Sequence, residues 1–259
     1  MIDPESVKMV KNRVTGNFWI QKGFDRNVIP FDIEAHFDLS DVTFKCPYPH
    51  GHYFFYDSSD EVISSGSVAL LMQREGMDQY LDLEVLYVGQ SYGQDGDRTA
   101  DLRLESHSTL QLVYAEMSRL SPDQEVWLIL STFEKNLISV MDGRAENTDT
   151  TDDEDDAHLS EVISTPLSEQ QFINFTEAAL IRYFSPEFNE KFKATFPSPA
   201  HTTYSECYTL DINSLMIHME TDELGVRLMS PTVCAKYIHH HSFPLHDSAK
   251  RKALLDVLA

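Results

Sequence analysis

The stretch Leu83–Met117, LEVLYVGQSYGQDGDRTADLRLESHSTLQLVYAEM, decides the fold that the sequence predicts. It begins with an apolar run typical of a buried strand and passes through a glycine-punctuated turn. It ends with apolar residues three and four positions apart, which predict a helix from about Ala100 to Leu120, with Pro122 beyond its end. A strand followed by a helix indicates the α/β (α+β) class.

Strands and helices are also predicted on both sides of this stretch. Before it, NFWIQ, DVTFKC and HYFFYD are rich in β-formers, and GSVALLMQ is expected to form a buried strand. After it, EVWLILSTF predicts another strand and LISVMD its hairpin partner. LSEQQFINFTEAALIRYF predicts a second long helix, because Ser168 and Gln171 form a capping-box start and Pro186 ends the pattern. SAKRKALLDVL predicts a short final helix.

We expect three regions along the chain. Residues 1–65 form a β-rich N-terminal lobe, residues 66–200 an α/β domain, and residues 201–259 a mixed C-terminal extension. Within the second region, Met141–Val162 holds nine acidic side chains and one arginine. Dense like charge with little hydrophobicity predicts a mobile loop at residues 147–157, as a solvated insertion rather than a docking site for a basic partner.

Composition indicates an acidic cytoplasmic protein. The formal net charge is −22, and such a field repels polyanions at long range. The three cysteines are odd in number and far apart, which is typical of reduced thiols. No apolar run approaches a membrane span, and the start MIDPESVKMV lacks the pattern of a secretory signal, so no membrane contact is expected.

Several candidate catalytic residues fall on or beside the two long predicted helices. Arg103 and His107 lie one helical turn apart, and Tyr87 lies at the end of the strand before them. Glu177 has apolar neighbours at helical spacing, where a carboxylate is costly unless it meets a cation or hydrogen-bond donors. Asn189 follows just past the proline that ends the second helix.

These residue types are the ingredients of metal-assisted phosphodiester hydrolysis. Arginine stabilises the negative charge that builds on phosphoryl oxygens. A glutamate can hold a hard divalent ion, and magnesium commonly takes only one or two carboxylates. Tyrosine or histidine can orient or deprotonate the attacking water. Taken alone, however, a polar stripe on a helix is usually a solvated face.

The segments LYVGQS, RLESH and EAALIRYFSPEFN, in this order, resemble the GIY-YIG nuclease superfamily. The resemblance covers roughly residues 66–197. YVG at Tyr87 stands where the family has its second signature, Tyr-Ile-Gly. Arg103 and His107 match the family's arginine and histidine on the first helix, while Glu177 and Asn189 match its metal-binding glutamate and trailing asparagine.

The resemblance implies a small antiparallel sheet flanked by helices and an endonuclease that uses Mg²⁺ or Mn²⁺, with the metal held by Glu177. It implies nucleic acid as substrate, with DNA preferred over RNA. Arg98 is expected to contact phosphate or to cap the turn that precedes the helix. Lys191 and Lys193, next to Asn189, are either a phosphate-contacting patch or ordinary surface lysines.

Two departures from the family pattern leave alternatives open. GSVALLMQ, where the first signature Gly-Ile-Tyr should lie, has no tyrosine, so water activation would fall to Tyr87 or His107. The connection SYGQDGDRTADL is also longer than in the family. One alternative is a catalytically impaired nuclease-fold subunit that acts as an acidic protein-interaction module. Another is an acidic mimic of DNA that occupies the basic groove of another protein.

Two further segments concentrate histidines. CPYPHGH (Cys46, His50 and His52) lacks a recognisable zinc spacing, which favours a polar loop. YIHHHSFPLHD contains His239, His240, His241 and His246. Because adjacent residues of a strand point to opposite faces, a shared metal site in this segment is the less favoured interpretation.

Overall fold

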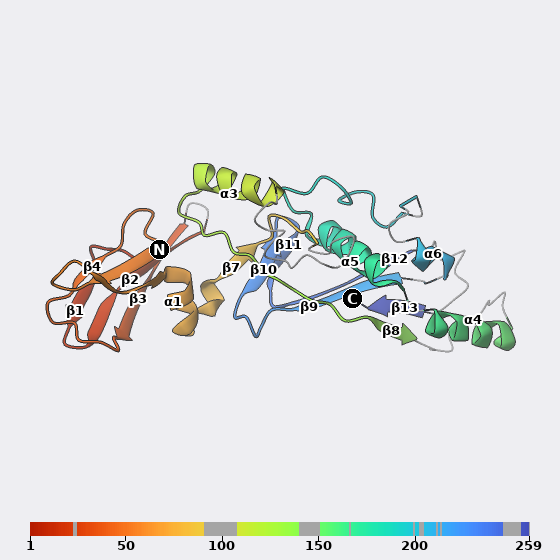
Figure 1. Cartoon of the computed structure of the whole chain (residues 1–259), viewed down its shortest axis with the longest axis horizontal. Helices are drawn as coiled ribbons and strands as arrows, with labels where there is room; N and C mark the ends of the chain where they lie inside the picture. Colours follow the sequence, from red (N-terminus) through yellow and green to blue (C-terminus); the bar gives the residue numbers. More distant parts are fainter. Residues whose placement is uncertain are drawn as a thin grey trace. The chain divides into compact units, whose positions relative to one another are not determined.

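The computed structural model describes residues 1–22, 25–90, 108–139, 151–165, 167–198, 200–201, 205–210, 212, 214–245 and 255–258. The class is α+β, as predicted, because helices combine with several small, mainly antiparallel sheets (Figure 1). The chain divides into two compact units: unit 1 comprises Met1–Asp82 and Tyr114–Leu128, and unit 2 comprises Leu83–Val113 and Ile129–Ala259. This division differs from the predicted boundaries at residues 65 and 200.

Unit 1 contains two antiparallel sheets of three strands each. The first has the order β1 (Lys8–Val10), β2 (Arg13–Lys22) and β3 (Asp25–Glu34). The second has the order β4 (Thr43–Lys45), β5 (His52–Tyr56) and β6 (Val62–Ser67). The N-terminal part of the chain is therefore rich in strands. It is followed by helix α1 (Val68–Arg74) and the short 3-10 helix η1 (Asp78–Tyr80).

The core of unit 1 is largely aromatic. The rings of Phe18 on β2 and Phe31 on β3 lie 4.5 Å apart, and Phe18 is fully buried. Ile2 bridges to Phe18 and is also buried. Val14, Ile33, Phe55, Val68, Leu71 and Met72 are also buried. Alternation along the strands directs the strand residues among them to the covered faces of the sheets.

The prediction of a strand at GSVALLMQ was wrong, since Val68–Arg74 forms α1. The Ser67 hydroxyl accepts a hydrogen bond from the Ala69 N–H and caps the helix. Val68, Leu71 and Met72 are buried at positions i, i+3 and i+4, which is the helical period. A short apolar run does not by itself separate a strand from a helix, and here the serine cap decides between them.

The segment Glu125–Phe133, EVWLILSTF, was also predicted as a strand, but it pairs with no strand in the described part of the chain. In unit 1, the Glu125 carboxylate accepts from the Ser67 hydroxyl at 2.9 and 2.7 Å and from the Trp127 indole N–H at 3.3 Å. These contacts hold the start of the segment beside the N-terminus of α1. In unit 2, Ile129 and Phe133 pack against the buried core.

Unit 2 contains a mixed four-stranded sheet and a small three-stranded sheet. The first has the order β12 (Ile238–Pro244), β9 (Ser214–Glu220), β13 (Leu255–Leu258) and β8 (Asn136–Ser139); only the β9–β13 pair is parallel. The second has the order β11 (Val233–Lys236), β10 (Arg227–Ser230) and β7 (Asp82–Glu84).

Helix α5 (Glu169–Phe184) organises the core of unit 2. Its predicted start and stop are confirmed: the Ser168 hydroxyl accepts from the Gln171 N–H, and Ser185 ends the helix in the left-handed conformation, before Pro186. Phe172, Phe175, Ala178, Ala179, Leu180 and Phe184 are buried on the helix. They pack in one cluster with Leu215 and Ile217 of β9 and Phe243 of β12, and α5 lies along these strands in Figure 1.

The prediction of a mobile loop over residues 147–157 was wrong for its second half, because α4 (Asp152–Ser164) begins there. Residues 147–150 lie outside the described part of the chain. Thr151 and Glu154 form a complete capping box, and carboxylates near a helix N-terminus interact favourably with the helix dipole. Val162 is buried in the core of unit 2, and the His158 Nε2–H donates to the Leu210 carbonyl at 2.8 Å. The helix is therefore anchored despite its charge.

Two other helices differ from their predicted ranges, and α6 (Glu206–Thr209) was not predicted. The helix expected from Ala100 to Leu120 is described as α3 (Ser108–Leu120), and residues 100–107 lie outside the described part. The final helix expected in SAKRKALLDVL is wrong over its described part, since Leu255–Leu258 is β13. Pairing with both β8 and β9 outweighs the local helical preference there. In the described part of the chain, no helix is long and apolar enough to cross a membrane.

Candidate functional site

Helix α5 fixes the position of Glu177, the predicted metal ligand. Glu177 is half-buried and lies about two turns before the end of the helix, between the buried residues Thr176 and Ala178. The Thr176 hydroxyl donates to the Phe172 carbonyl at 2.8 Å within the same helix. Because the neighbouring residues are buried in the core, the backbone at Glu177 has little freedom to move.

Asn189 holds the Tyr-Val-Gly turn through its side-chain amide. Its Oδ1 accepts from the Val88 N–H at 2.9 Å, and its Nδ2–H donates to the Val88 carbonyl at 2.8 Å. The Phe188 N–H adds a bond of 3.0 Å to the Leu86 carbonyl. Asn189 is 8% exposed, so both side-chain bonds are shielded from water. Two predicted site segments 101 residues apart in the chain are thus joined by a paired amide contact, which we call the Asn189–Val88 clamp.

Tyr87 and Gly89 flank this clamp. The Tyr87 side chain is half-buried and folds back over Gly89. A Cβ atom at position 89 would lie 2.7 Å from both Cε1 and the hydroxyl oxygen of Tyr87, closer than van der Waals contact allows. The absence of a side chain at Gly89 therefore permits the observed orientation of the phenol. On the other side of the turn, the Val85 N–H donates to the Met229 carbonyl of β10 at 2.9 Å.

A side chain with a buried polar atom follows the Tyr-Val-Gly turn. Gln90 follows the turn directly, and its Oε1 is buried without a hydrogen-bond partner in the described part of the chain. Among the described residues, no group of three or more His, Cys, Asp or Glu side chains is arranged to hold a metal. Mg²⁺ needs few protein ligands because it retains waters and binds substrate phosphate oxygens. A single carboxylate, Glu177, suits that mode.

The remaining predicted site residues fall into two groups. Arg98, Arg103 and His107 lie outside the described residues. Lys191 is exposed, whereas the Lys193 ammonium donates to the Glu187 carbonyl at 3.3 Å and the Lys193 carbonyl accepts from Arg182. Lys193 thus closes the loop that carries Asn189, which gives it a structural contact in addition to any contact with substrate.

An aromatic and histidine pair was not anticipated from the sequence. Tyr183 on α5 and the fully buried His239 on β12 are hydrogen-bonded, with 3.2 Å between the Tyr183 hydroxyl and Nδ1. The Nε2 of His239 lies 3.0 Å from the Lys236 carbonyl, to which it can only donate. In the neutral imidazole, Nδ1 therefore accepts a hydrogen bond from the Tyr183 hydroxyl. Burial accordingly lowers the pKa of His239 below its ordinary value.

Three basic side chains gather around Tyr183, and we call them the basic cluster: Arg182, Lys236 and His241. The Lys236 ammonium lies 5.7 Å from the centre of the Tyr183 ring, and the His241 ring lies 5.4 Å from it. Burial lowers the pKa of His241, and the nearby charges of His240, Arg182 and Lys236 lower it further. Arg182 and Lys236 thus place two positive charges near Tyr183 on a chain whose net charge is −22.

The histidine triplet contained the signal for this arrangement. On β12, His239 is buried and the adjacent His240 is exposed, as expected for neighbours on opposite faces of a strand; His241 is exposed as well. The two histidines two residues apart, His239 and His241, both contact Tyr183. The sequence could not identify α5 as the element that they contact. In CPYPHGH, the His50 Nδ1 bonds the Cys46 carbonyl at 2.7 Å, and Cys46 is a free thiol.

Comparison with known protein families, with curated proteins and with solved structures finds no match to this chain. The resemblance to the GIY-YIG superfamily therefore stays a prediction.

Proposed function

We propose that this chain is a Mg²⁺- or Mn²⁺-dependent endonuclease that hydrolyses phosphodiester bonds, with DNA preferred over RNA. The observation that carries the proposal is the Asn189–Val88 clamp. It supports the proposal because the two segments that it joins are those that carry the sequence resemblance. If the resemblance were due to chance, there would be no reason to expect that Asn189 bonds both the N–H and the carbonyl of Val88. Asn189 is buried and lies 101 residues from Val88 in the chain.

The proposed roles follow from residue chemistry. Glu177 would hold the divalent ion, which supplies charge neutralisation at the scissile phosphate when bound. Arg103 would stabilise the negative charge that develops on the phosphoryl oxygens. Tyr87 and His107 would position the attacking water or accept its proton. Asn189 acts indirectly, because its amide holds the backbone from which the Tyr87 phenol projects.

Substrate binding would use positively charged side chains. Arg98, Lys191 and Lys193 are the candidates from the sequence, and the basic cluster adds Arg182 and Lys236. Phosphate contacts fix a nucleic acid on a protein and make its affinity fall steeply with salt. The net charge of −22 repels a polyanion at long range, and the positive charges of the basic cluster would attract it locally.

Cleavage of supercoiled plasmid DNA in Mg²⁺ or Mn²⁺ tests the proposal. The wild-type chain should nick the plasmid, and Glu177→Ala and Arg103→Ala should each slow nicking by about 100-fold or more. Glu169→Ala, an exposed carboxylate on the same helix, and Arg119→Ala, an exposed arginine on α3, are matched controls that should keep wild-type rates. Equal nicking by all five proteins would remove the proposed site.

A second candidate function is a nuclease-fold subunit without turnover that acts as an acidic interaction module. It is favoured by one observation: the segment expected to carry the first family signature is helix α1 and contains no tyrosine. Titration calorimetry separates the two candidates. The interaction module would be favoured if the chain binds neither Mg²⁺ nor Mn²⁺, even with uncleavable DNA present, and forms a stable complex with a basic protein.

A further inference from the structure

A semi-open cavity lies in unit 1, and none of the candidate nuclease residues in the described part of the chain lines it. It has a volume of about 180 Å³ and is bounded by β3, the segment that follows it, β4, β5, β6 and α1. Ile2, Val14, Ile33 and Leu71 give it an apolar floor. Five aromatic rings line its walls: Phe31, Phe37, Phe44, Tyr53 and Phe55. Cavities lined in this way, with a few polar groups at one side, are typical of small-molecule sites.

The volume limits what the cavity can hold. An apolar cavity of about 150 Å³ in another protein accommodates one benzene ring. By the same measure, a cavity of about 180 Å³ holds one phenyl-sized group and little more. The rings of Phe37 and Phe44 both lie 5.3 Å from that of Phe55, within the range of favourable aromatic pairing. A phenyl group inserted beside them would gain contacts of the same kind.

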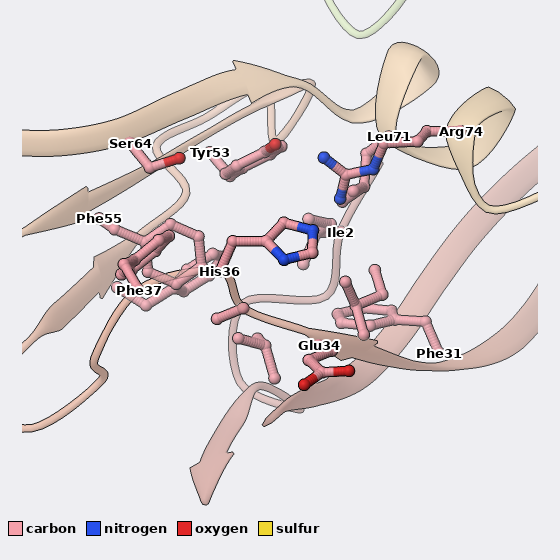
Figure 2. A pocket seen from close by; sticks show the side chains of 14 residues that line it. Ile2, Phe31, Glu34, His36, Phe37, Tyr53, Phe55, Ser64, Leu71 and Arg74 are labelled. Atoms are coloured by element: carbon pink, nitrogen blue, oxygen red, sulfur yellow. The ribbon is translucent and has the colours of Figure 1, made fainter. Parts of the chain in front are cut away.

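The mouth of the cavity carries opposite charges that are not paired with each other. Arg74 of α1 forms its ion pair with the neighbouring Glu75, at 3.2 Å. Glu34 of β3 accepts a hydrogen bond from the Asn12 amide, at 2.8 Å. Figure 2 shows the Arg74 guanidinium and the Glu34 carboxylate on either side of the His36 imidazole. All three side chains are exposed, so a ligand in the cavity can reach them from solvent.

We propose that this cavity binds a free α-amino acid with a phenyl-sized apolar side chain, of which phenylalanine is the simplest. The side chain enters the aromatic cavity, the α-carboxylate meets Arg74, and the α-ammonium meets Glu34. An apolar body with one positive and one negative group matches the floor and both charges of the mouth. A purely apolar ligand would leave both charges unused, and an acid or amine alone would leave one unused.

Three ligands of the same ring size test the proposal on the full-length chain by NMR titration: L-phenylalanine, 3-phenylpropionate and phenethylamine. Phenylpropionate lacks the ammonium group and phenethylamine lacks the carboxylate. We expect phenylalanine to bind with the lowest Kd and each of the other two to bind about tenfold more weakly or worse. Equal affinity for all three, or no binding of phenylalanine at millimolar concentration, would overturn the proposal.

Charge variants give a crossed pattern that non-specific binding cannot reproduce. Arg74→Gln should weaken the binding of phenylalanine and of phenylpropionate but leave the Kd of phenethylamine unchanged. Glu34→Gln should weaken the binding of phenylalanine and of phenethylamine but leave the Kd of phenylpropionate unchanged. Arg26→Gln removes a charge at the opposite end of β3 from Glu34 and should change none of the three Kd values. Loss of affinity for all three ligands in both charge variants, without the crossed pattern, would contradict the assigned orientation.

A pair of adjacent serines provides the control for the cavity itself. Ser64 lines the cavity, whereas Ser65, next on the same strand β6, is exposed and points to the other face. Ser64→Phe fills the cavity and should abolish binding of all three ligands, while Ser65→Phe should bind them as the wild type does. Thermal unfolding would confirm that both variants fold. Unchanged binding by a folded Ser64→Phe variant would place the ligand elsewhere and refute the proposal.

Discussion

The aromatic residues have different structural roles in the two units: they fill the core of unit 2 and line a cavity in unit 1. In unit 2, Phe172, Phe175 and Phe184 of α5 are buried in one cluster with residues of β9 and β12, and the rings of Phe172 and Phe175 are 5.1 Å apart. In unit 1, Phe37 follows β3 and Phe44 lies on β4; both are only half-buried and line a cavity. A long amphipathic helix closes a core, whereas short strands with long connections leave space that a ligand can fill.

The largest expected effect tests this comparison in the cores. Phe175 and Phe18 are both almost completely buried, in unit 2 and unit 1 respectively. Phe175→Ala and Phe18→Ala should each lower the free energy of unfolding by about 3–5 kcal/mol, because each removes a ring and leaves a void. Urea denaturation measures the loss. Phe37→Ala, at the half-buried wall of the cavity, should cost clearly less; an equal cost would mean that the cavity wall is packed like the core.

The Asn189–Val88 clamp should give the next largest effect. Asn189→Ala leaves the N–H and the carbonyl of Val88 without partners, and we expect it to cost about 2–4 kcal/mol in the free energy of unfolding. Hydrogen exchange at the Val88 amide should accelerate at the same time. Asn12→Ala removes an exposed amide that bonds Glu34 and is the matched control, with a cost below about 1 kcal/mol. Similar costs for the two variants would contradict the clamp.

His239 predicts a dependence of stability on pH in unit 2. Its pKa in the folded chain is lowered from 6.5, so below about pH 6.5 the unfolded chain binds more protons than the folded chain. The free energy of unfolding should therefore fall as the pH drops through that range, by at most about 1.4 kcal/mol per pH unit for this one proton.

His239→Gln should reduce that slope without removing it, because the pKa of His241 is lowered in the same direction. Urea denaturation at a series of pH values measures both slopes. If the free energy of unfolding of His239→Gln depends on pH as steeply as that of the wild type, the lowered pKa of His239 does not contribute to the slope. That result would contradict the buried position of His239 beside Tyr183.

The smallest effect concerns the acidic helix α4. Thr151→Ala removes the capping box and should cost about 1 kcal/mol of local stability, seen as faster hydrogen exchange of the capped Glu154 amide and of the amides in the second turn of α4. Thr151→Ser keeps the hydroxyl and should behave as the wild type. If exchange at Glu154 and across residues 156–160 is already fully unprotected in the wild type, the loop that the sequence predicts would be the better description.

The sequence was a reliable guide where local signals and long periodicity agree. Helix α5 has a serine cap at its start, an apolar pattern along its 16 residues and a proline just beyond its end, and these three signals predict the same helix. It failed at α1 and at β13, which are short apolar runs whose state is decided by a single cap or by the strands beside them. Charge density misled the prediction for α4, because the same carboxylates that oppose a core favour a helix N-terminus.

The candidate site was predictable only in part for a related reason. Motif order suggested Tyr87 and Asn189 as members of one site, and the clamp through Val88 joins their segments. The pairing of Tyr183 with His239 and the cavity of unit 1 depend on contacts between elements far apart in the chain. No local pattern in a single sequence encodes such contacts, since many partners would satisfy the same periodicity.

Paramagnetic broadening by Mn²⁺ tests the central claim, which is that Glu177 holds a divalent ion beside the Tyr87–Gly89 turn. In the wild-type chain with uncleavable DNA, Mn²⁺ should broaden the NMR signal of the Val88 amide, which the clamp holds in place. Glu177→Ala should lose that broadening, and the exposed control Glu169→Ala should retain it. Equal broadening in all three proteins, or broadening confined to other residues, would contradict the claim.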